Sequence, residues 1–234
     1  MKNLLLLFTI FSLTACTSSD DNSAADTTTP PTAAETIIGN WTTQFTESEG
    51  TVNGRITFTE SGEMSIYLEI TPTGSDETIS SVEGKTWTLD GDQFSTTDTL
   101  DNDTDTDTLT VNNQDSISIL TTDGETLNLT RVDAYETSLI GDWEGTDPEN
   151  CISTVQISFT NSNTYSSIVT NMDCENEVIN VGGTFTRNSG TLSGTLSFVD
   201  EITNETNNAY YAVQGDAMLL FFEGSDDGYV LFKQ

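Results

Sequence analysis

Residues 37–41 read Ile-Ile-Gly-Asn-Trp and residues 139–143 read Leu-Ile-Gly-Asp-Trp, so one motif occurs twice with its glycines 102 positions apart. Further pairs of similar segments keep nearly the same offset: 56–59 with 157–160, and 127–131 with 229–233. A constant offset over the whole length indicates an internal duplication. Each copy has about 100 residues, a usual size for a domain that folds independently. We therefore predict two domains, at 37–133 and 138–234.

Within each copy, apolar and polar residues alternate, as in Met64-Ser-Ile-Tyr-Leu-Glu-Ile70 and Val155-Gln-Ile-Ser-Phe159. A period of two is typical of antiparallel strands with one buried face. Turn-forming pairs separate these runs at hairpin spacing, among them Ser61-Gly62, Asp90-Gly91, Asn112-Asn113, Asp123-Gly124 and Ser189-Gly190. No segment shows a helical period. The sequence predicts an all-β protein of two tandem, small, antiparallel up-and-down β-barrels, with β-sandwiches as the alternative.

The first fifteen residues have the features of an export signal. Lys2 is followed by an apolar stretch at 4–13, which is shorter than the roughly 20 residues that a spanning helix needs. The stretch ends in Leu13-Thr14-Ala15-Cys16, which resembles the lipobox of bacterial lipoproteins. The resemblance implies a signal peptide at 1–15, diacylglycerol on Cys16 and an acyl chain such as palmitate on the new N-terminus. The alternative is an ordinary secretory signal with a chance cysteine.

Residues 16–36 are mostly Thr, Ser, Asp, Ala and Pro without apolar periodicity, which predicts a flexible tether. Asp20 and Asp21 follow the cysteine closely. This placement resembles the signal that sends lipoproteins of the Bacteroidetes type to the outer face of the outer membrane. We expect a protein anchored by lipid in the outer membrane and exposed at the cell surface, with the periplasmic face as the alternative.

The composition excludes several classes of function. The chain has 38 acidic residues, 6 basic residues and no histidine, and its net charge is −32. Such a charge repels nucleic acid, so no nucleic-acid partner is expected. The lack of histidine rules out a Ser-His-Asp triad and histidine-ligated zinc. We expect no enzymatic activity and no obligatory cofactor.

Besides Cys16, the chain contains two cysteines, Cys151 and Cys174. In an exported protein two such residues most simply form a disulfide bond. The alternatives are two free thiols or a metal site whose other ligands are missing.

The opening [IL]-Ile-Gly-x-Trp, a following strand with x-Phe-Thr, and hairpins that end in a short last strand together resemble the lipocalin-like domains of Bacteroidetes lipoproteins. The resemblance implies that the tryptophan closes one end of each barrel and that a basic residue of the last strand packs over it. The residues concerned are Gly39, Trp41 and Arg131 in the first copy, and Gly141, Trp143 and Lys233 in the second. A cation over an indole ring is worth about 0.5–2 kcal/mol, so these residues are predicted to be structural.

The densest run of carboxylates contains aspartates at every second position, namely Asp101, Asp103, Asp105 and Asp107. Calcium prefers six to eight oxygen ligands, so a weak calcium site is one hypothesis for this run. A solvated hairpin loop is the other, because the run lacks the turn glycine and the closing glutamate of a calcium loop.

Two functions remain for such a protein. The first is the binding of a small apolar or glycan ligand in a barrel mouth or at the domain junction. The alternative is a non-catalytic structural or interaction protein of the cell surface with filled barrel cores, whose protein partners the sequence does not identify. Trp87 could stack on a sugar ring or pack in a core, and the adjacent Tyr210 and Tyr211 should point to opposite faces of a strand.

Overall fold

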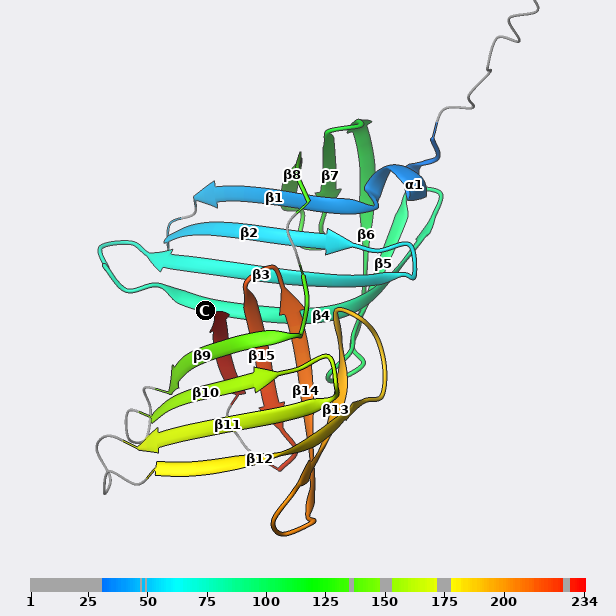
Figure 1. The fold of residues 1–234 in the computed structure, drawn as a ribbon. Helices are drawn as coiled ribbons and strands as arrows, with labels where there is room; N and C mark the ends of the chain where they lie inside the picture. Colours follow the sequence, from blue (N-terminus) through cyan, green and yellow to red (C-terminus); the bar gives the residue numbers. More distant parts are fainter. Residues whose placement is uncertain are drawn as a thin grey trace, which may run out of the picture. The chain divides into compact units, whose positions relative to one another are not determined.

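The computed structural model describes residues 31–234 except 47, 49, 135–136, 148–152, 172–177 and 225–227. Within these residues the chain forms one short helix and sixteen strands, which close into two eight-stranded antiparallel barrels in tandem. The all-β prediction is confirmed, and of the two architectures considered the barrel is the one observed. Figure 1 shows the two meanders, blue to green for the first and green to red for the second.

Barrel 1 is an uninterrupted meander in which each strand pairs with the next and β8 returns to β1. Its elements are α1 (Ala33–Ile37), β1 (Gly39–Thr46), β2 (Gly50–Phe58), β3 (Glu63–Pro72), β4 (Ile79–Asp90), β5 (Gln93–Asp98), β6 (Thr104–Asn113), β7 (Ser116–Leu120) and β8 (Thr126–Val132).

Barrel 2 repeats this order, and β16 closes it against β9. Its strands are β9 (Gly141–Asp147), β10 (Ser153–Phe159), β11 (Thr164–Asn171), β12 (Val178–Arg187), β13 (Ser193–Asp200), β14 (Thr206–Gln214), β15 (Ala217–Phe222) and β16 (Gly228–Lys233).

The strand register sends alternate side chains into each barrel, as the period of two requires. Trp41 pairs with Ile56, and Ile56 pairs with Ile66, so all three face the interior of barrel 1. In barrel 2 the same positions are taken by Trp143 and Ile157. The apolar cores include fully buried side chains from both ends of each meander: Ile37, Trp41, Ile117 and Leu129 in barrel 1, and Trp143, Leu196, Tyr211, Leu220 and Leu231 in barrel 2.

The helix α1 begins inside the segment 16–36 that the sequence predicted to be a flexible tether, so that prediction was wrong for residues 33–36. Thr32 and Glu35 form a capping box: the Thr32 hydroxyl accepts from Glu35 N at 3.2 Å, and the Glu35 carboxylate accepts from Thr32 N at 2.7 Å. Ile37 ends the helix fully buried in the core of barrel 1. In the described part of the chain, no helix has the length and apolarity needed to cross a membrane.

Candidate functional site at the junction of the barrels

The two barrels touch along strand β14, and this strand is therefore buried on both of its faces. The last six residues of the strand, 209–214, are all buried. Tyr211 points into barrel 2, whereas Tyr210 and Ala212 point outward and pack against Tyr67 and Val82 of barrel 1. A strand buried on both faces carries a continuous apolar run, as Ala-Tyr-Tyr-Ala-Val at 209–213 does.

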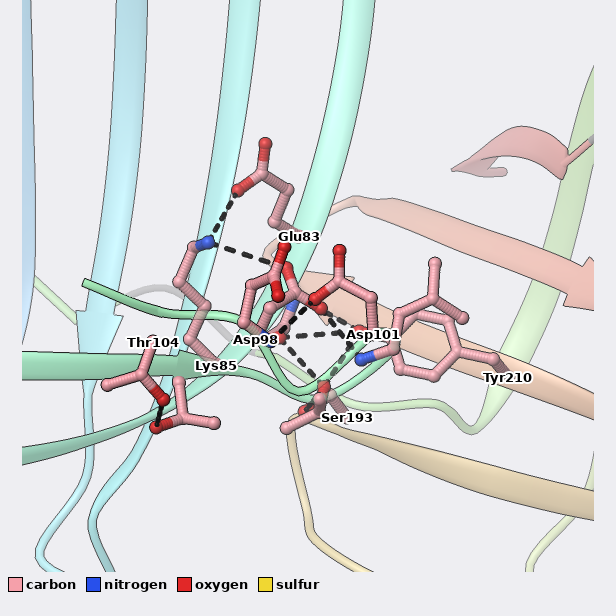
Figure 2. A network of polar contacts seen from close by, with 12 residues as sticks. Glu83, Lys85, Asp98, Asp101, Thr104, Ser193 and Tyr210 are labelled. Atoms are coloured by element: carbon pink, nitrogen blue, oxygen red, sulfur yellow. Dashed lines mark hydrogen bonds and ion pairs between the residues drawn. The ribbon is translucent and has the colours of Figure 1, made fainter.

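A buried polar cluster joins the barrels beside these apolar contacts (Figure 2). The Tyr210 hydroxyl accepts a hydrogen bond from Gly84 N at 3.2 Å and lies 2.9 Å from Thr99 Oγ1. Thr99 Oγ1 also lies 2.7 Å from the Gly84 carbonyl oxygen and 3.2 Å from Ser193 Oγ. Burial raises the pKa of Tyr210 to about 12, so the phenol is neutral at physiological pH.

Gly84 leaves room for this cluster. A Cβ atom added to Gly84 would come within 2.7 Å of the Tyr210 hydroxyl oxygen and would collide with the side chain of Ser193. The backbone of β4 can therefore approach β13 and β14 only because position 84 carries no side chain.

A second polar contact crosses the junction at the start of β3. The Glu63 carboxylate accepts hydrogen bonds from Thr191 N at 2.6 Å, from Thr191 Oγ1 at 2.7 Å and from Leu192 N at 3.2 Å. Burial by itself would raise the pKa of Glu63, but these hydrogen bonds outweigh it and the pKa is lowered. One carboxylate of barrel 1 thus holds the β12–β13 turn of barrel 2.

On the other side of β4, charged side chains point into barrel 1. Lys85 pairs in register with Met64 and so faces inward, and its Nζ lies 3.3 Å from Glu83 and 3.4 Å from Asp98. Burial by itself would lower the pKa of Lys85, but the attraction of the two carboxylates outweighs it and the pKa is raised. Lys85 is therefore a cation. Asp98 also accepts a hydrogen bond from Leu100 N at 2.7 Å, which ties this ion cluster to the loop between β5 and β6 (Figure 2).

That loop forms one wall of a groove of about 500 Å³ between the barrels. Leu100 contributes the wall from barrel 1 and is 47% exposed. Barrel 2 contributes the rest through the outer faces of β13, β14 and β15 and through the residues that directly follow β12 and β15. The lining residues include Ser197, Asn208, Tyr210 and Phe221 on the strands, and Asn188 and Glu223 beyond their ends.

A chain of hydrogen bonds runs across the barrel 2 side of the groove. Asn188 Nδ2 donates to Ser197 Oγ at 3.0 Å, and Ser197 Oγ donates to Asn208 Oδ1 at 2.9 Å. Asn208 Nδ2 then donates to Glu223 Oε2 at 3.0 Å. We call these four residues the polar ladder. Every bond points toward the carboxylate, so the donor and acceptor ends of both amides have a defined orientation.

The residues predicted to close barrel 1 lie together. The Arg131 guanidinium carbon is 4.3 Å from the centre of the Trp41 ring. Arg131 also donates from Nε to the Gln114 carbonyl at 2.7 Å, from Nη1 to the Ile38 carbonyl at 2.9 Å and from Nη2 to the Thr36 carbonyl. Gly39 has φ +131°, and a Cβ atom there would collide with the guanidinium.

The second barrel has the same arrangement with weaker contacts. Lys233 Nζ lies 5.7 Å from the centre of the Trp143 ring, and a Cβ atom on Gly141 would lie 2.8 Å from Lys233 Cε. Each tryptophan also donates from Nε1 to the carbonyl four residues earlier, Trp41 to Ile37 at 2.7 Å and Trp143 to Leu139 at 2.9 Å.

The structure does not gather the aspartates of the proposed calcium site. Asp101 accepts from Asp103 N at 2.9 Å in the turn before β6, and Asp107 accepts from Thr122 N at 3.2 Å. Asp105 and Asp107 lie along β6, on the side that pairs with Thr96 and Phe94. Among the described residues, no three acidic or cysteine side chains form a group that could hold a metal ion. The carboxylates of Asp101 and Asp107 are instead used in separate contacts with backbone N–H groups.

The three cysteines, Cys16, Cys151 and Cys174, lie outside the described residues. Lipidation of Cys16 and the Cys151–Cys174 disulfide stay predictions.

The structure shows where the aromatic residues Trp87, Tyr210 and Tyr211 lie. Trp87 is only 9% exposed, packs edge-on against Phe58 with ring centres 5.9 Å apart, and donates from Nε1 to the Glu63 carbonyl at 3.1 Å. It is therefore a core residue of barrel 1. Tyr210 and Tyr211 do point to opposite faces of β14, one toward barrel 1 and one into barrel 2.

Sequence reasoning did not identify the groove or the polar ladder. The residues of the groove are scattered between positions 100 and 223. Alternation along a strand predicts only that such side chains point outward, and this does not distinguish them from side chains that face solvent. The available signal was the apolar runs at 209–213 and 217–222, which indicate an outer face covered by another surface.

Searches against models of known protein families and against curated proteins found no match for this chain. The protein is thus defined by its architecture, two closed eight-stranded antiparallel barrels in tandem, which is compatible with lipocalin-like barrels.

Proposed function

We propose that this chain is a non-catalytic binding protein of the bacterial envelope, with two lipocalin-like barrels and a small ligand in the groove between them. The observation that carries the proposal is the groove itself, which combines the exposed Leu100 and the partly buried Phe221 with a hydrogen-bonded polar ladder. Ligand sites in proteins are typically concave and largely apolar, with a few oriented polar groups, and they occur preferentially between domains.

The packing of the barrels supports a site outside rather than inside them. At the tryptophan end of each barrel, bulky side chains such as Trp41, Phe58, Trp143 and Phe159 are 0–2% exposed. Close-packed interiors leave no room for a ligand without displacing these side chains. The absence of histidine from the chain supports a role in binding rather than catalysis.

Anchoring to the membrane is part of the proposal and rests on the first sixteen residues. We propose that Cys16 carries the lipid and holds the protein at the outer membrane, facing the cell exterior. The test is metabolic labelling with a palmitate analogue in a bacterial host: the wild-type chain should be labelled and sediment with membranes, and a Cys16→Ser variant should be neither. Labelling of the variant would refute the anchor.

The binding proposal is tested by native mass spectrometry of the full chain isolated from its own envelope, together with a variant that fills the groove. Ser197→Trp places a large ring at the centre of the polar ladder. The matched control is Ser118→Trp, because Ser118 sits in a similar chain on barrel 1, accepting from Asn112 at 2.8 Å and donating to Asn128 at 2.9 Å. A ligand retained by the wild type and the control but lost from Ser197→Trp supports the proposal. A ligand that survives in Ser197→Trp refutes the groove as its site.

The alternative is a structural or interaction protein of the cell surface that acts through its outer faces. The filled tryptophan ends and the firm junction between the barrels favour it. It predicts that no small molecule accompanies the wild-type chain in the same experiment.

A further inference from the structure

On the basis of the proposed function, we infer that the ligand of the groove is an uncharged glycan, with a sugar ring against Leu100 and Phe221 and its hydroxyl groups on the polar ladder. The inference names the chemical class of the ligand from three features of the lining: its hydrogen-bonding groups, its apolar surface and its charge.

The polar ladder offers both donors and acceptors. Within the described part of the chain, the bonds of the ladder leave the side-chain carbonyl oxygen of Asn188, one side-chain N–H group of Asn208 and the oxygen Oε1 of Glu223 for a ligand. Asn188 directly follows β12, Asn208 lies on β14 and Glu223 directly follows β15, so the row crosses a sheet in which adjacent strands are about 4.8 Å apart. A ligand that satisfies such a row needs several groups that both donate and accept, and a set of neighbouring hydroxyl groups fits this requirement.

The apolar side of the groove is held in place by contacts with both barrels. Phe221 packs against the apolar cluster at the junction, and the hydroxyl of Tyr210 is occupied by Thr99 and Gly84, so both residues present carbon surface. The Leu100 loop is held by Asp98 through Leu100 N. A surface held from both barrels loses little conformational freedom on binding, and the C–H face of a sugar ring can lie on it.

The charge of the lining selects against other ligands. Among the described residues that line the groove, the one charged side chain is the carboxylate of Glu223. The whole chain carries a net charge of −32. An acidic sugar or a fatty acid would place a negative charge near the Glu223 carboxylate, and no cationic side chain among the described lining residues would compensate the repulsion. An alkyl chain would in addition cover the polar ladder and leave its remaining donors and acceptors without partners.

The test compares three kinds of probe on the purified full chain by isothermal titration calorimetry. The neutral probes are maltohexaose, cellohexaose, xylohexaose and mannohexaose, the acidic probe is hexagalacturonate, and the apolar probe is palmitate. Asn208→Leu keeps the size of an exposed side chain but removes the middle of the polar ladder. Asn112→Leu is the matched control, because Asn112 is an exposed asparagine of barrel 1 that donates to Ser118 in a similar way.

We expect at least one neutral oligosaccharide to bind, with affinity reduced about tenfold or more in Asn208→Leu and unchanged in Asn112→Leu. Binding of hexagalacturonate or palmitate alone, sensitive to Asn208→Leu, would overturn the inference of an uncharged glycan and leave the groove as a binding site. Binding of a neutral oligosaccharide that is equally strong in both variants would place it elsewhere and overturn the inference. No binding of any probe, combined with no ligand on the native chain, would overturn the inference and the proposed function together. Circular dichroism of both variants, matched to the wild type, establishes that a loss of affinity is not a loss of fold.

Discussion

Replacing Glu63 by glutamine should loosen the contact between the barrels without changing its shape. The carboxylate of Glu63 accepts three hydrogen bonds from the β12–β13 turn. A glutamine keeps one carbonyl oxygen for the two backbone N–H groups, and its amide group can donate to the Thr191 hydroxyl. The change therefore replaces charge-assisted bonds by neutral ones.

The size of the effect follows from the energies of the two kinds of bond. Hydrogen bonds to charged groups contribute about 1.5–3 kcal/mol, and neutral ones contribute about 0.5–1.5 kcal/mol. Because Glu63 is only partly buried, we take the lower part of the difference and expect Glu63→Gln to reduce the free energy of unfolding by about 1–2 kcal/mol at pH 7. Urea unfolding followed by tryptophan fluorescence measures it, with Trp41 and Trp87 reporting on barrel 1 and Trp143 on barrel 2.

The pH dependence of this loss gives a sharper test. Burial works to raise the pKa of Glu63 and the hydrogen bonds work to lower it, with a net lowering from 4.5. A carboxylate with a lowered pKa contributes its stabilisation fully above its unfolded pKa and loses it as the pH falls through the folded pKa. The difference in unfolding free energy between wild type and Glu63→Gln should therefore be constant above about pH 5 and shrink as the pH falls below 4.5. Equal unfolding midpoints at pH 7, or a difference that does not shrink below pH 4.5, would refute the reasoning. The exposed Glu77, changed to glutamine, is the control and should have little effect.

Three further predictions concern other contacts. Arg131→Met should reduce the free energy of unfolding by about 2–3 kcal/mol and Lys233→Met by about 0.5–1 kcal/mol, because Arg131 adds three hydrogen bonds to its ring contact. Urea unfolding compares the two variants, and equal losses would contradict the expected difference. Gly84→Ala should cost about 1–3 kcal/mol by pushing β4 away from Ser193, and a crystal structure showing an unmoved junction would argue against the steric account. Burial raises the pKa of both Tyr210 and Tyr211 to about 12, so ultraviolet titration should find two tyrosines there, and Tyr210→Phe should remove one of them; a curve that keeps both would contradict the assignment.

The architecture could be predicted because it depends on periodic features. The alternation in 64–70 and 155–159 sets which side chains enter each barrel, and β3 and β10 have that parity in the structure. The glycines of the predicted turns Gly62, Gly91 and Gly124 do adopt positive φ angles. By contrast, Asn112 and Asn113 lie within the end of β6, where the register shifts, because a bulge and not a turn absorbs the extra residue there.

The candidate site could not be predicted in the same way. It depends on which outer face of one barrel meets which outer face of the other, and a pattern of alternation describes only the inner and outer sides of a single sheet. Asp98 illustrates the difficulty: in the sequence it is one of many aspartates, whereas in the structure it pairs with Lys85 and orients Leu100. The tether prediction failed at α1 for a simpler reason, since the capping box of Thr32 and Glu35 was a local signal that had no apolar periodicity around it.

The junction also bears on how the duplicated chain assembles. Barrel 1 uses its third and fourth strands, and barrel 2 uses its sixth and seventh, so the contact is heterologous, head to tail. Contacts of this kind continue indefinitely if every copy carries both surfaces, and they then produce filaments. In barrel 1 the sixth strand exposes a row of threonines, Thr104, Thr106, Thr108 and Thr110, where barrel 2 has the buried outer face of β14. Because that row is polar, this face of barrel 1 lacks the apolar surface by which β14 joins the two barrels and by which a series of such contacts would be extended.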